Sequence, residues 1–208
     1  MKESTILLLH GLGQREDSWA GVIRHLPGWS IRAPRLIEPE AKGETYGDCL
    51  ARAERAMPQG EPLVLCGVSQ GAILAMHLAL GHPSPVRALV LVAPQVKMPR
   101  LLLRVQNGLF RCMPRRVFDK IGVTKESMMS ICASMEALDF RERLSALSCP
   151  VHILLGEKDR ANLPAARRMQ GFLPQSRLTL VPGAGHEVNV DAPEALARCI
   201  DEACRALG

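Results

Sequence analysis

Aromatic residues are scarce in this chain: Phe, Trp and Tyr together make up 3% of its 208 residues. A hydrophobic core must therefore be built mainly from Leu, Val, Ile, Ala and Met, and the hydrophobic content of 47% is sufficient for one. The scarcity also argues against a nucleic-acid-binding protein, because such surfaces interleave aromatic with basic side chains, and no recognised binding motif is present. The length suits one domain with a sizeable core, so we expect residues 1–208 to form a single domain.

Long hydrophobic runs and paired cysteines are also lacking. No apolar run approaches the ~20 residues needed to cross a bilayer. The apolar stretch at residues 6–9 is shorter than the roughly seven to fifteen residues of a secretory signal. The seven cysteines are odd in number and show no CxxC spacing, which argues against a disulfide scaffold or a zinc site and favours a reducing compartment. We therefore expect a cytoplasmic protein without a bound metal.

Short apolar runs alternate with helical patterns along the chain. Continuous apolar runs, rather than alternating ones, predict strands that are buried on both faces of a parallel sheet. Their alternation with helices predicts an α/β fold with a mostly parallel six-stranded sheet flanked by helices. The predicted strands are residues 5–9, 30–33, 63–68, 86–93, 151–155 and 178–181, and the predicted helices are residues 15–26, 43–57, 70–81, 162–173 and 192–206.

One connection is much longer than the others. Residues 95–149 separate the fourth predicted strand from the fifth, whereas a usual crossover is about half as long or less. Its apolar content predicts helices, and an insert at this place usually lies over the carboxyl ends of the strands, where ligands bind. We call residues 95–149 the helical insert and expect it to form a small lid. It contains ten basic and five acidic residues and so carries the whole net charge of +5.

The segment CGVSQGA, residues 66–72, places a serine between two glycines at the end of the third predicted strand. The pattern G-x-S-x-G at a strand-to-helix turn is the nucleophile elbow, in which a strained backbone exposes the serine hydroxyl at the edge of the sheet. Strand and helix approach so closely there that Gly67 and Gly71 have no room for side chains. Ser69 is therefore predicted to be a nucleophile, with a plain turn residue as the alternative interpretation.

A serine nucleophile needs a base, and the base needs a group that orients it. Asp159 follows the fifth predicted strand in GEKDRANLP, and His186 follows the sixth in the glycine-rich segment VPGAGHEVN. Both loops lie at the same edge of a parallel sheet as Ser69. Two alternatives remain for the acid: Asp159 as the N-cap of the helix that begins near Asn162, and Glu157 as a competing carboxylate. The alternative for His186 is a surface histidine.

The segment LLLHGLG ends the first predicted strand with residues 10–13. Its glycines leave backbone amides accessible to a substrate oxygen. The backbone N–H of Leu12 is placed to join that of Gln70, the residue after the serine, in an oxyanion hole. His10 is expected to be structural rather than catalytic.

These motifs together resemble those of the α/β-hydrolases. HGLG, GVSQG, GEKD and PGAGHEVNVDAPEAL occur in the order of that family and span nearly the whole chain. The resemblance implies an α/β-hydrolase fold with a catalytic triad of Ser69, Asp159 and His186. It implies oxyanion donors at the backbone N–H groups of Leu12 and Gln70. The sheet is expected to be shortened, because the family commonly has two antiparallel strands before the HG strand, which here begins at residue 5.

The resemblance implies a serine hydrolase, similar to carboxylesterases and lipases, that cleaves a small-molecule carboxylic ester or thioester through an acyl-enzyme without a metal or organic cofactor. Among enzymes, the alternative is C–C bond hydrolysis, lyase or perhydrolase activity by the same triad. From another class of protein, the alternative is a non-catalytic binding protein on the same fold.

The helical insert has two further features. We expect Leu102, Leu109 and Phe110 to line an acyl pocket, with plain packing as the alternative. Arginines are interleaved with these apolar residues, which predicts an amphipathic, basic element above the site. The alternatives for this charge are a solvated face, attraction of an anionic substrate, and contact with an acidic membrane surface, of which membrane contact is not favoured.

Overall fold

The structure is a computed structural model that describes residues 4–206, the side chain of Leu102 excepted. Its centre is a six-stranded sheet in the order β2-β1-β3-β4-β5-β6, in which every pairing is parallel. The strands are β1 (Thr5–Leu9), β2 (Ser30–Arg32), β3 (Leu63–Val68), β4 (Val86–Val92), β5 (Val151–Gly156) and β6 (Arg177–Val181). The predicted strands are thus confirmed to within one residue at each end.

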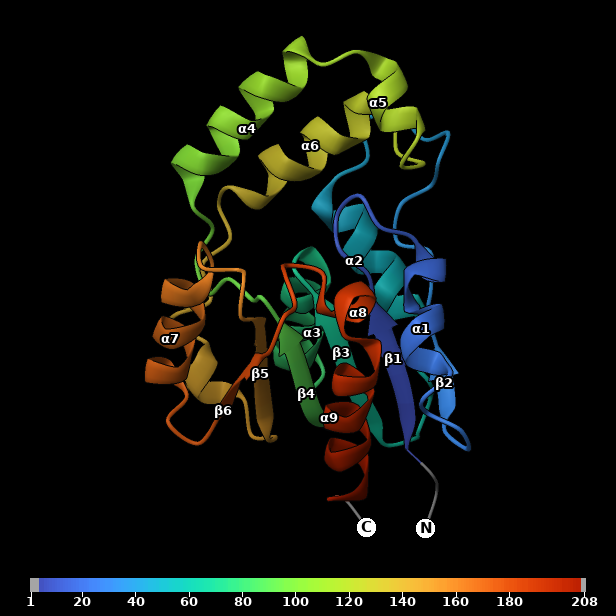
Figure 1. The fold of residues 1–208 in the computed structure, drawn as a ribbon, viewed down its shortest axis with the longest axis vertical. Coiled ribbons are helices and arrows are strands. Elements are labelled where there is room, and N and C mark those ends of the chain that lie inside the picture. The colour runs from blue at the N-terminus through green and yellow to red at the C-terminus, as the bar shows by residue number, and fades with distance from the viewer. Residues whose placement is uncertain (1–3, 207–208) are drawn as a thin grey trace.

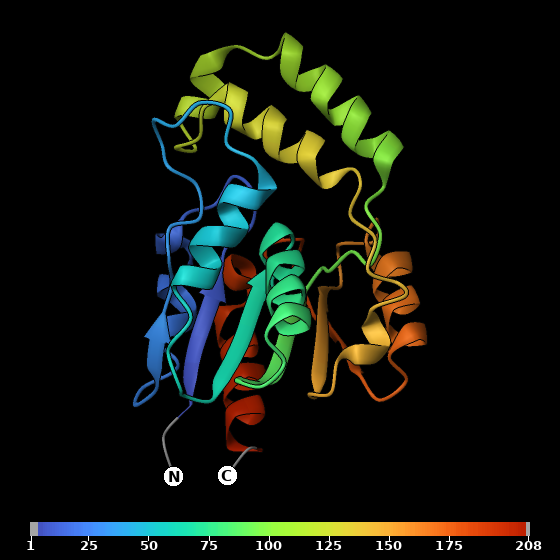
Figure 2. The same ribbon diagram turned by 180° about the vertical axis from the view of Figure 1, so that it is seen from behind.

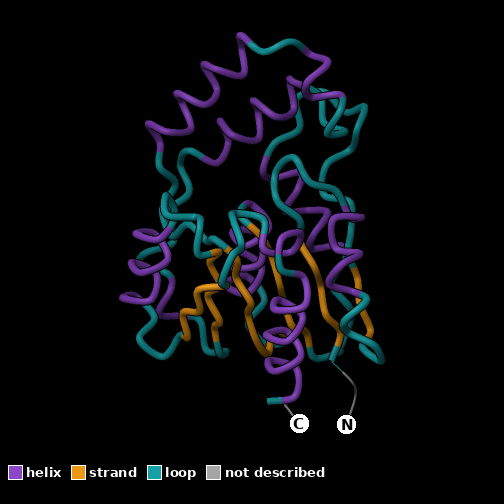
Figure 3. The backbone as a smooth tube through the Cα atoms, in the orientation of Figure 1, coloured by secondary structure: helices purple, strands orange, loops and turns teal. Residues whose placement is uncertain are grey.

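Burial follows the position of each strand in the sheet, which Figure 3 shows enclosed by helices and loops. Every residue of β1 and β3 is buried, as expected of apolar runs that are covered on both faces. The edge strands β2 and β6 are more exposed. This exposure explains why the sequence pattern of β2 is weaker than that of the central strands.

Helices cover both faces of the sheet (Figures 1 and 2). One face is covered by α1 (Ala20–Ile23), α8 (Val188–Asp191) and α9 (Pro193–Arg205). The other face is covered by α2 (Tyr46–Arg55) and α3 (Gln70–Gly81). Helix α7 (Leu163–Phe172) packs beside β5 and β6. The helix predicted at residues 15–26 is shorter than expected, since it consists of the 3-10 helix η1 (Glu16–Trp19) followed by α1.

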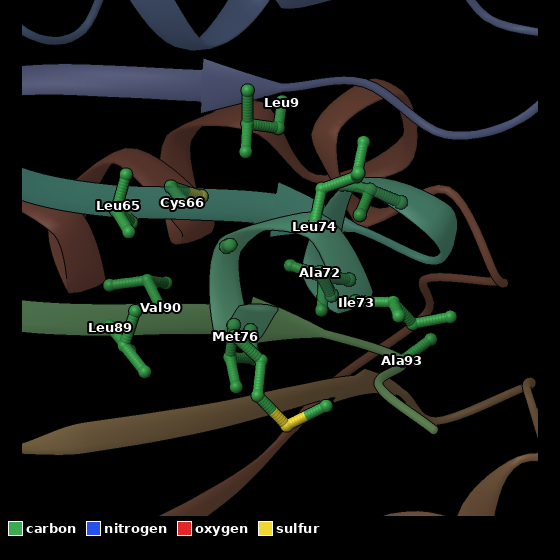
Figure 4. Close-up of a cluster of buried hydrophobic side chains, with 14 of the residues drawn as sticks. Leu9, Leu65, Cys66, Ala72, Ile73, Leu74, Met76, Leu89, Val90 and Ala93 are labelled. Atoms are coloured by element: carbon green, nitrogen blue, oxygen red, sulfur yellow. The ribbon is translucent and has the colours of Figure 1, made fainter. Parts of the chain in front are cut away.

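Helix α3 begins directly after Ser69 and is almost entirely apolar. Its residues from Gln70 to Met76 are all buried. Figure 4 shows Ala72, Leu74 and Met76 packed beside β1, β3 and β4. A helix of this kind is an internal element of the fold rather than a surface element, and it holds the turn at its N-terminus rigidly against the sheet.

The helical insert contains three helices, α4 (Arg100–Cys112), α5 (Arg115–Asp119) and α6 (Lys125–Met135), followed by the 3-10 helix η2 (Leu144–Ala146). The three α-helices lie over the carboxyl ends of the strands (Figures 1 and 2). Its outgoing and returning segments pair at an isolated bridge between Lys97 and Asp139. Buried residues of the insert, Leu103 and Ile131 among them, belong to the same hydrophobic cluster as the sheet.

Helix α6 is the part of the insert that is fastened to the body of the protein. The hydroxyl of Ser127 donates to the carbonyl of Ala41 at 2.8 Å and accepts from the backbone N–H of Glu44 at 3.2 Å. The backbone N–H of Tyr46, at the start of α2, donates to the hydroxyl of Ser134 at 2.8 Å. The insert is therefore anchored through its inner helix, with α4 packed on α6.

Candidate active site

Ser69 lies in the sharp turn between β3 and α3 and has a backbone conformation that side chains rarely adopt, with φ of 54° and ψ of −113°. The approach of strand and helix explains the flanking glycines. A Cβ atom on Gly67 would lie 2.1 Å from the carbonyl oxygen of Gly71, and one on Gly71 would lie 1.9 Å from that of Leu9. The backbone N–H of Ser69 donates to the carbonyl of Val92 at 2.9 Å, which ties the strained turn to β4.

Asp159 and His186 meet across two adjacent loops at the same edge of the sheet. His186 Nδ1 lies 2.6 Å from Asp159 Oδ2. The loops touch because Gly156 has no side chain: a Cβ there would lie 1.9 Å from the carbonyl oxygen of Gly185. The backbone N–H of Lys158 also donates to the carbonyl of Ala184 at 2.9 Å. The fold thus positions Asp159 and His186 through backbone contacts of their own loops.

The structure distinguishes the two carboxylates by their contacts with His186. The carboxylate of Glu157 accepts from the backbone N–H of Gly183 at 3.1 Å, and no contact with His186 is recorded for it among the described residues. The N-cap of α7 is Asn162, not Asp159. Asp159 is buried, and its side chain faces His186.

Two polar residues that the sequence interpretation missed complete this arrangement. The side-chain amide of Asn162 donates to both carboxylate oxygens of Asp159, at 2.8 Å and 2.9 Å. Its own carbonyl accepts from Gln95 Nε2 at 2.8 Å. Asn162 Nδ2 and His186 Nδ1 are 3.3 Å apart because both groups point an N–H at the same carboxylate. The available signal was the position of Gln95, a polar residue just after the apolar strand β4.

The turn after β1 is held by side chains, and Leu12 within it lines the same cavity as Ser69. Gln14 Oε1 accepts from the backbone N–H of Gly11 at 3.1 Å, and Gln14 is in turn fixed by Asn189 Oδ1 at 3.2 Å. Among the hydrogen bonds of the described residues, none uses the backbone N–H of Leu12 or of Gln70. Both residues line one cavity together with Ser69 and His186.

His10 also holds this turn in place, through contacts of both its ring nitrogens with backbone groups. It is buried, its Nδ1 lies 3.0 Å from the carbonyl oxygen of Gly11, and its Nε2 accepts from the backbone N–H of Leu36 at 3.1 Å. This pair of contacts requires the neutral ring with its proton on Nδ1. Burial accordingly lowers the pKa of His10, although the carbonyl of Gly11 opposes the shift.

The cavity beneath the helical insert has a volume of about 400 Å³. Ser69 and His186 both line it, and the described residues show no hydrogen bond between them, which is common before substrate binds. No Lys, Arg, Asp or Glu is among the described lining residues. The apolar lining consists of Leu12, Ile73, Met98, Pro99, Leu103, Phe110, Met113, Val117, Phe118, Ile121, Met128, Cys132 and Met135.

The three predicted pocket residues of α4 have different outcomes. Phe110 lines the cavity and packs edge-on against Phe118, with ring centroids 5.6 Å apart. Leu109 is 62% exposed and does not line the cavity, so the prediction for this residue is wrong. One residue along a helix turns a side chain by about 100°, which takes Leu109 out of the cavity that Phe110 enters. The side chain of Leu102 lies outside the described part of the structure.

A parallel α/β sheet with a serine elbow after its third strand, and an Asp–His pair in the loops after its fifth and sixth strands, defines the α/β-hydrolase class. The family model described as the alpha/beta hydrolase family matches residues 6–199. The chain therefore belongs to the alpha/beta hydrolase family.

Individual relatives are distant but cover most of the chain. The sequence is 25% identical to a 2-hydroxy-6-oxononadienedioate/2-hydroxy-6-oxononatrienedioate hydrolase of Pseudomonas putida, over 94% of this chain and 86% of that protein. It is 24% identical to a pimeloyl-[acyl-carrier protein] methyl ester esterase of Aromatoleum aromaticum, over 99% and 100%. The crystal structure of NosK from Streptomyces actuosus superimposes with a TM-score of 0.80 at 23% identity, covering 99% of each chain, which confirms the fold.

Within residues 4–206, no helix has both the length and the apolar character needed to cross a bilayer. The same part of the chain contains no group of three or more His, Cys, Asp or Glu side chains arranged to hold a metal ion.

Proposed function

We propose that this protein is a serine hydrolase that cleaves a carboxylic ester or thioester through an acyl-enzyme. The observation that carries the proposal is the placement of Ser69, at a strained elbow, in the same cavity as His186, whose Nδ1 is 2.6 Å from Asp159. Since Nδ1 donates its proton to Asp159, His186 Nε2 carries a free lone pair and is the acceptor for the Ser69 proton.

In the first half of the reaction, His186 Nε2 takes the proton of Ser69 as its Oγ attacks the substrate carbonyl. The resulting tetrahedral oxyanion accepts from the backbone N–H groups of Leu12 and Gln70, which have no other recorded partner among the described residues. The imidazolium then protonates the leaving alcohol or thiol as its bond to the acyl carbon breaks. In the second half, His186 activates a water molecule, which releases the acid and restores Ser69.

The lining of the cavity supports an uncharged, apolar acyl group as the substrate. A carboxylate brought into this cavity would find no lysine or arginine among the described lining residues, and burial of an unpaired charge is costly. The relative from Pseudomonas putida acts, by its name, on a dicarboxylate, so its substrate class suits this cavity poorly. The methyl ester esterase from Aromatoleum aromaticum lends support to ester chemistry. In this proposal, the helical insert is the lid that encloses the acyl chain.

Labelling with a fluorophosphonate, followed by mass spectrometry, tests the nucleophile and separates an enzyme from a binding protein. We expect stoichiometric modification of Ser69 alone, and none in the Ser69→Ala variant. Labelling at another serine, or none on folded protein, contradicts the proposal. A panel of p-nitrophenyl esters of increasing chain length then tests the acyl preference, with hydrolysis of uncharged esters expected and preference for an ω-carboxylated ester as the opposing result.

A further inference from the structure

Helix α4 has a second apolar face, on the side that points away from the cavity. Leu101, Val105 and Leu109 are 77%, 53% and 62% exposed. Their spacing of four residues places them in one line along the helix. Leu103 and Phe110, by contrast, line the cavity. Packing within this chain accounts for the inner face alone, so the outer row of aliphatic side chains requires another explanation.

The position of α4 makes this row accessible. Figures 1 and 2 show α4 as the outermost helix of the insert, with α6 between it and the body of the protein. The row therefore lies along a convex ridge, outside the cavity that Leu103 and Phe110 line. A protein partner would need a matching groove to cover a ridge, whereas a deformable surface needs no such groove.

Positive charge borders the same row. Arg104 precedes Val105 by one residue, and Arg111 follows Leu109 by two, so both lie on one flank of the row at 100° per residue. Arg111 of α4 and Arg116 of the next helix, α5, are exposed. Within the described residues, neither forms an ion pair. The carboxylates of the insert are largely engaged, since Glu136 pairs with Arg104, Glu126 with Arg115 and Asp139 with Arg141 and Lys97.

We propose that the outer face of α4 is a docking surface for an anionic lipid bilayer. An amphipathic helix of this kind lies in the plane of the interface, with its aliphatic side chains in the acyl boundary and its arginines among the phosphate headgroups. A second copy of the chain fits the charge poorly, because a symmetric contact through this face would bring two sets of unpaired arginines together. The bilayer satisfies both the ridge shape and the positive charge.

Vesicle flotation measures this binding directly with the whole protein. We expect the wild-type chain to float with vesicles of equal parts phosphatidylglycerol and phosphatidylcholine at low salt. We expect little flotation with phosphatidylcholine alone, and weaker binding to the anionic vesicles at high salt, because salt screens the headgroup attraction. Equal binding to both vesicle types, or no binding to either, overturns the proposal.

Two sets of variants separate the apolar contribution from the charge. The triple variant Leu101→Gln, Val105→Gln, Leu109→Gln should weaken partitioning to anionic vesicles by about a hundredfold, because it removes three aliphatic side chains from the interface. The double variant Arg111→Gln, Arg116→Gln should weaken it by roughly tenfold or more, at about fivefold for each arginine near the surface. All five side chains are exposed, so the midpoint of thermal unfolding should change little.

Matched controls use the same substitutions elsewhere on the surface. Leu180→Gln with Val190→Gln removes two exposed apolar side chains, and Arg167→Gln with Arg168→Gln removes two exposed arginines of α7; both controls should bind like the wild type. Losses in these controls equal to those in the α4 variants overturn the proposal. So does a wild-type dimer that the triple variant converts to a monomer, since the row would then be a contact between copies.

Discussion

Asn162 donates its side-chain amide to both carboxylate oxygens of Asp159, at 2.8 Å and 2.9 Å. With Gln95 Nε2 donating to Asn162 Oδ1 at 2.8 Å, the carboxylate is held by a chain of two amides that starts at the first residue of the helical insert. The remaining contact of Asp159 Oδ2 is with His186 Nδ1. Asp159 is therefore held in place by Asn162 and by His186.

Replacement of Asn162 tests whether this amide positions the acid. Asn162→Ala should lower kcat about 10- to 100-fold with little change in KM, since a hydrogen bond to a charged group contributes about 1.5–3 kcal/mol. The stability of α7 should be preserved, because the Asn162 side chain makes no capping hydrogen bond. Steady-state kinetics and thermal denaturation measure the two effects. Arg167→Ala, on the exposed face of α7, is the control, and an equal loss of kcat there contradicts the positioning role.

The choice between the two carboxylates is tested by isosteric variants. Asp159→Asn should reduce kcat by roughly a thousandfold or more, because the amide favours the wrong tautomer of His186. Glu157→Gln should cost less than tenfold, since Glu157 contacts only the backbone N–H of Gly183 among the described residues. Rate measurements on both variants decide the assignment. The reverse order of effects would make Glu157 the acid.

Two glycines of α3 give a matched test of the elbow. Gly71→Ala places a Cβ 1.9 Å from the carbonyl oxygen of Leu9, whereas a Cβ on Gly81 meets nothing within 4 Å. We expect Gly71→Ala to lower the free energy of unfolding by about 3 kcal/mol or more, since backbone atoms must move apart. Gly81→Ala should be neutral or stabilising by up to about 1 kcal/mol, because Ala favours the helix. Urea unfolding measures both, and equal stabilities would show that the turn opens freely.

The backbone positions of the site were accessible from sequence, because they depend on local patterns. Continuous apolar runs such as Leu63–Val68 located the strands, and the loops at their carboxyl ends then located Ser69, Asp159 and His186. The directions of side chains on α4 were not accessible. Its apolar residues occur on both sides of the helix, so the pattern alone does not decide which side faces the cavity. The role of Asn162 was missed although Asp159 is only three residues away, because the direction of its amide and its contact with Gln95, 67 residues distant, depend on how the loops fold.

The burial of His10 predicts how stability depends on pH. Its pKa in the folded protein is lowered, with burial as the largest cause, so the unfolded chain binds the additional proton first as the pH falls. The free energy of unfolding should therefore decrease as the pH drops below about 6.5, the ordinary histidine pKa. Burial also lowers the pKa values of His77 and His152, and these act in the same direction.

A histidine variant isolates this contribution. Urea unfolding at about pH 7.5 and about pH 5 should show a smaller pH-dependent loss in His10→Gln than in the wild type, because one buried titrating group has been removed. His25→Gln, at an exposed position, serves as the control and should retain the wild-type difference. If His10→Gln shows the same pH-dependent loss in the free energy of unfolding as the wild type, then protonation of His10 contributes nothing to that loss.

Neighbouring residues of α4 provide a test of the acyl pocket. Phe110 lines the cavity and Leu109 is exposed, so truncation of each probes an opposite face of one helix. Phe110→Ala enlarges the cavity beside Phe118 and should shift the preferred p-nitrophenyl ester towards longer acyl chains, since each added CH₂ buried in the new space contributes about 0.8 kcal/mol. Leu109→Ala should leave the chain-length profile unchanged.

Met135 also lines the cavity, and its replacement by a larger side chain reduces the cavity volume. Met135→Phe fills part of the apolar space, so the preference should shift towards shorter chains while fluorophosphonate labelling of Ser69 is retained. Profiles of kcat/KM against chain length measure both shifts, because this ratio reports the interactions of the acyl group in the transition state. A profile that moves with Leu109→Ala, but with neither Phe110→Ala nor Met135→Phe, would place the acyl group on the outer face of α4, away from Ser69.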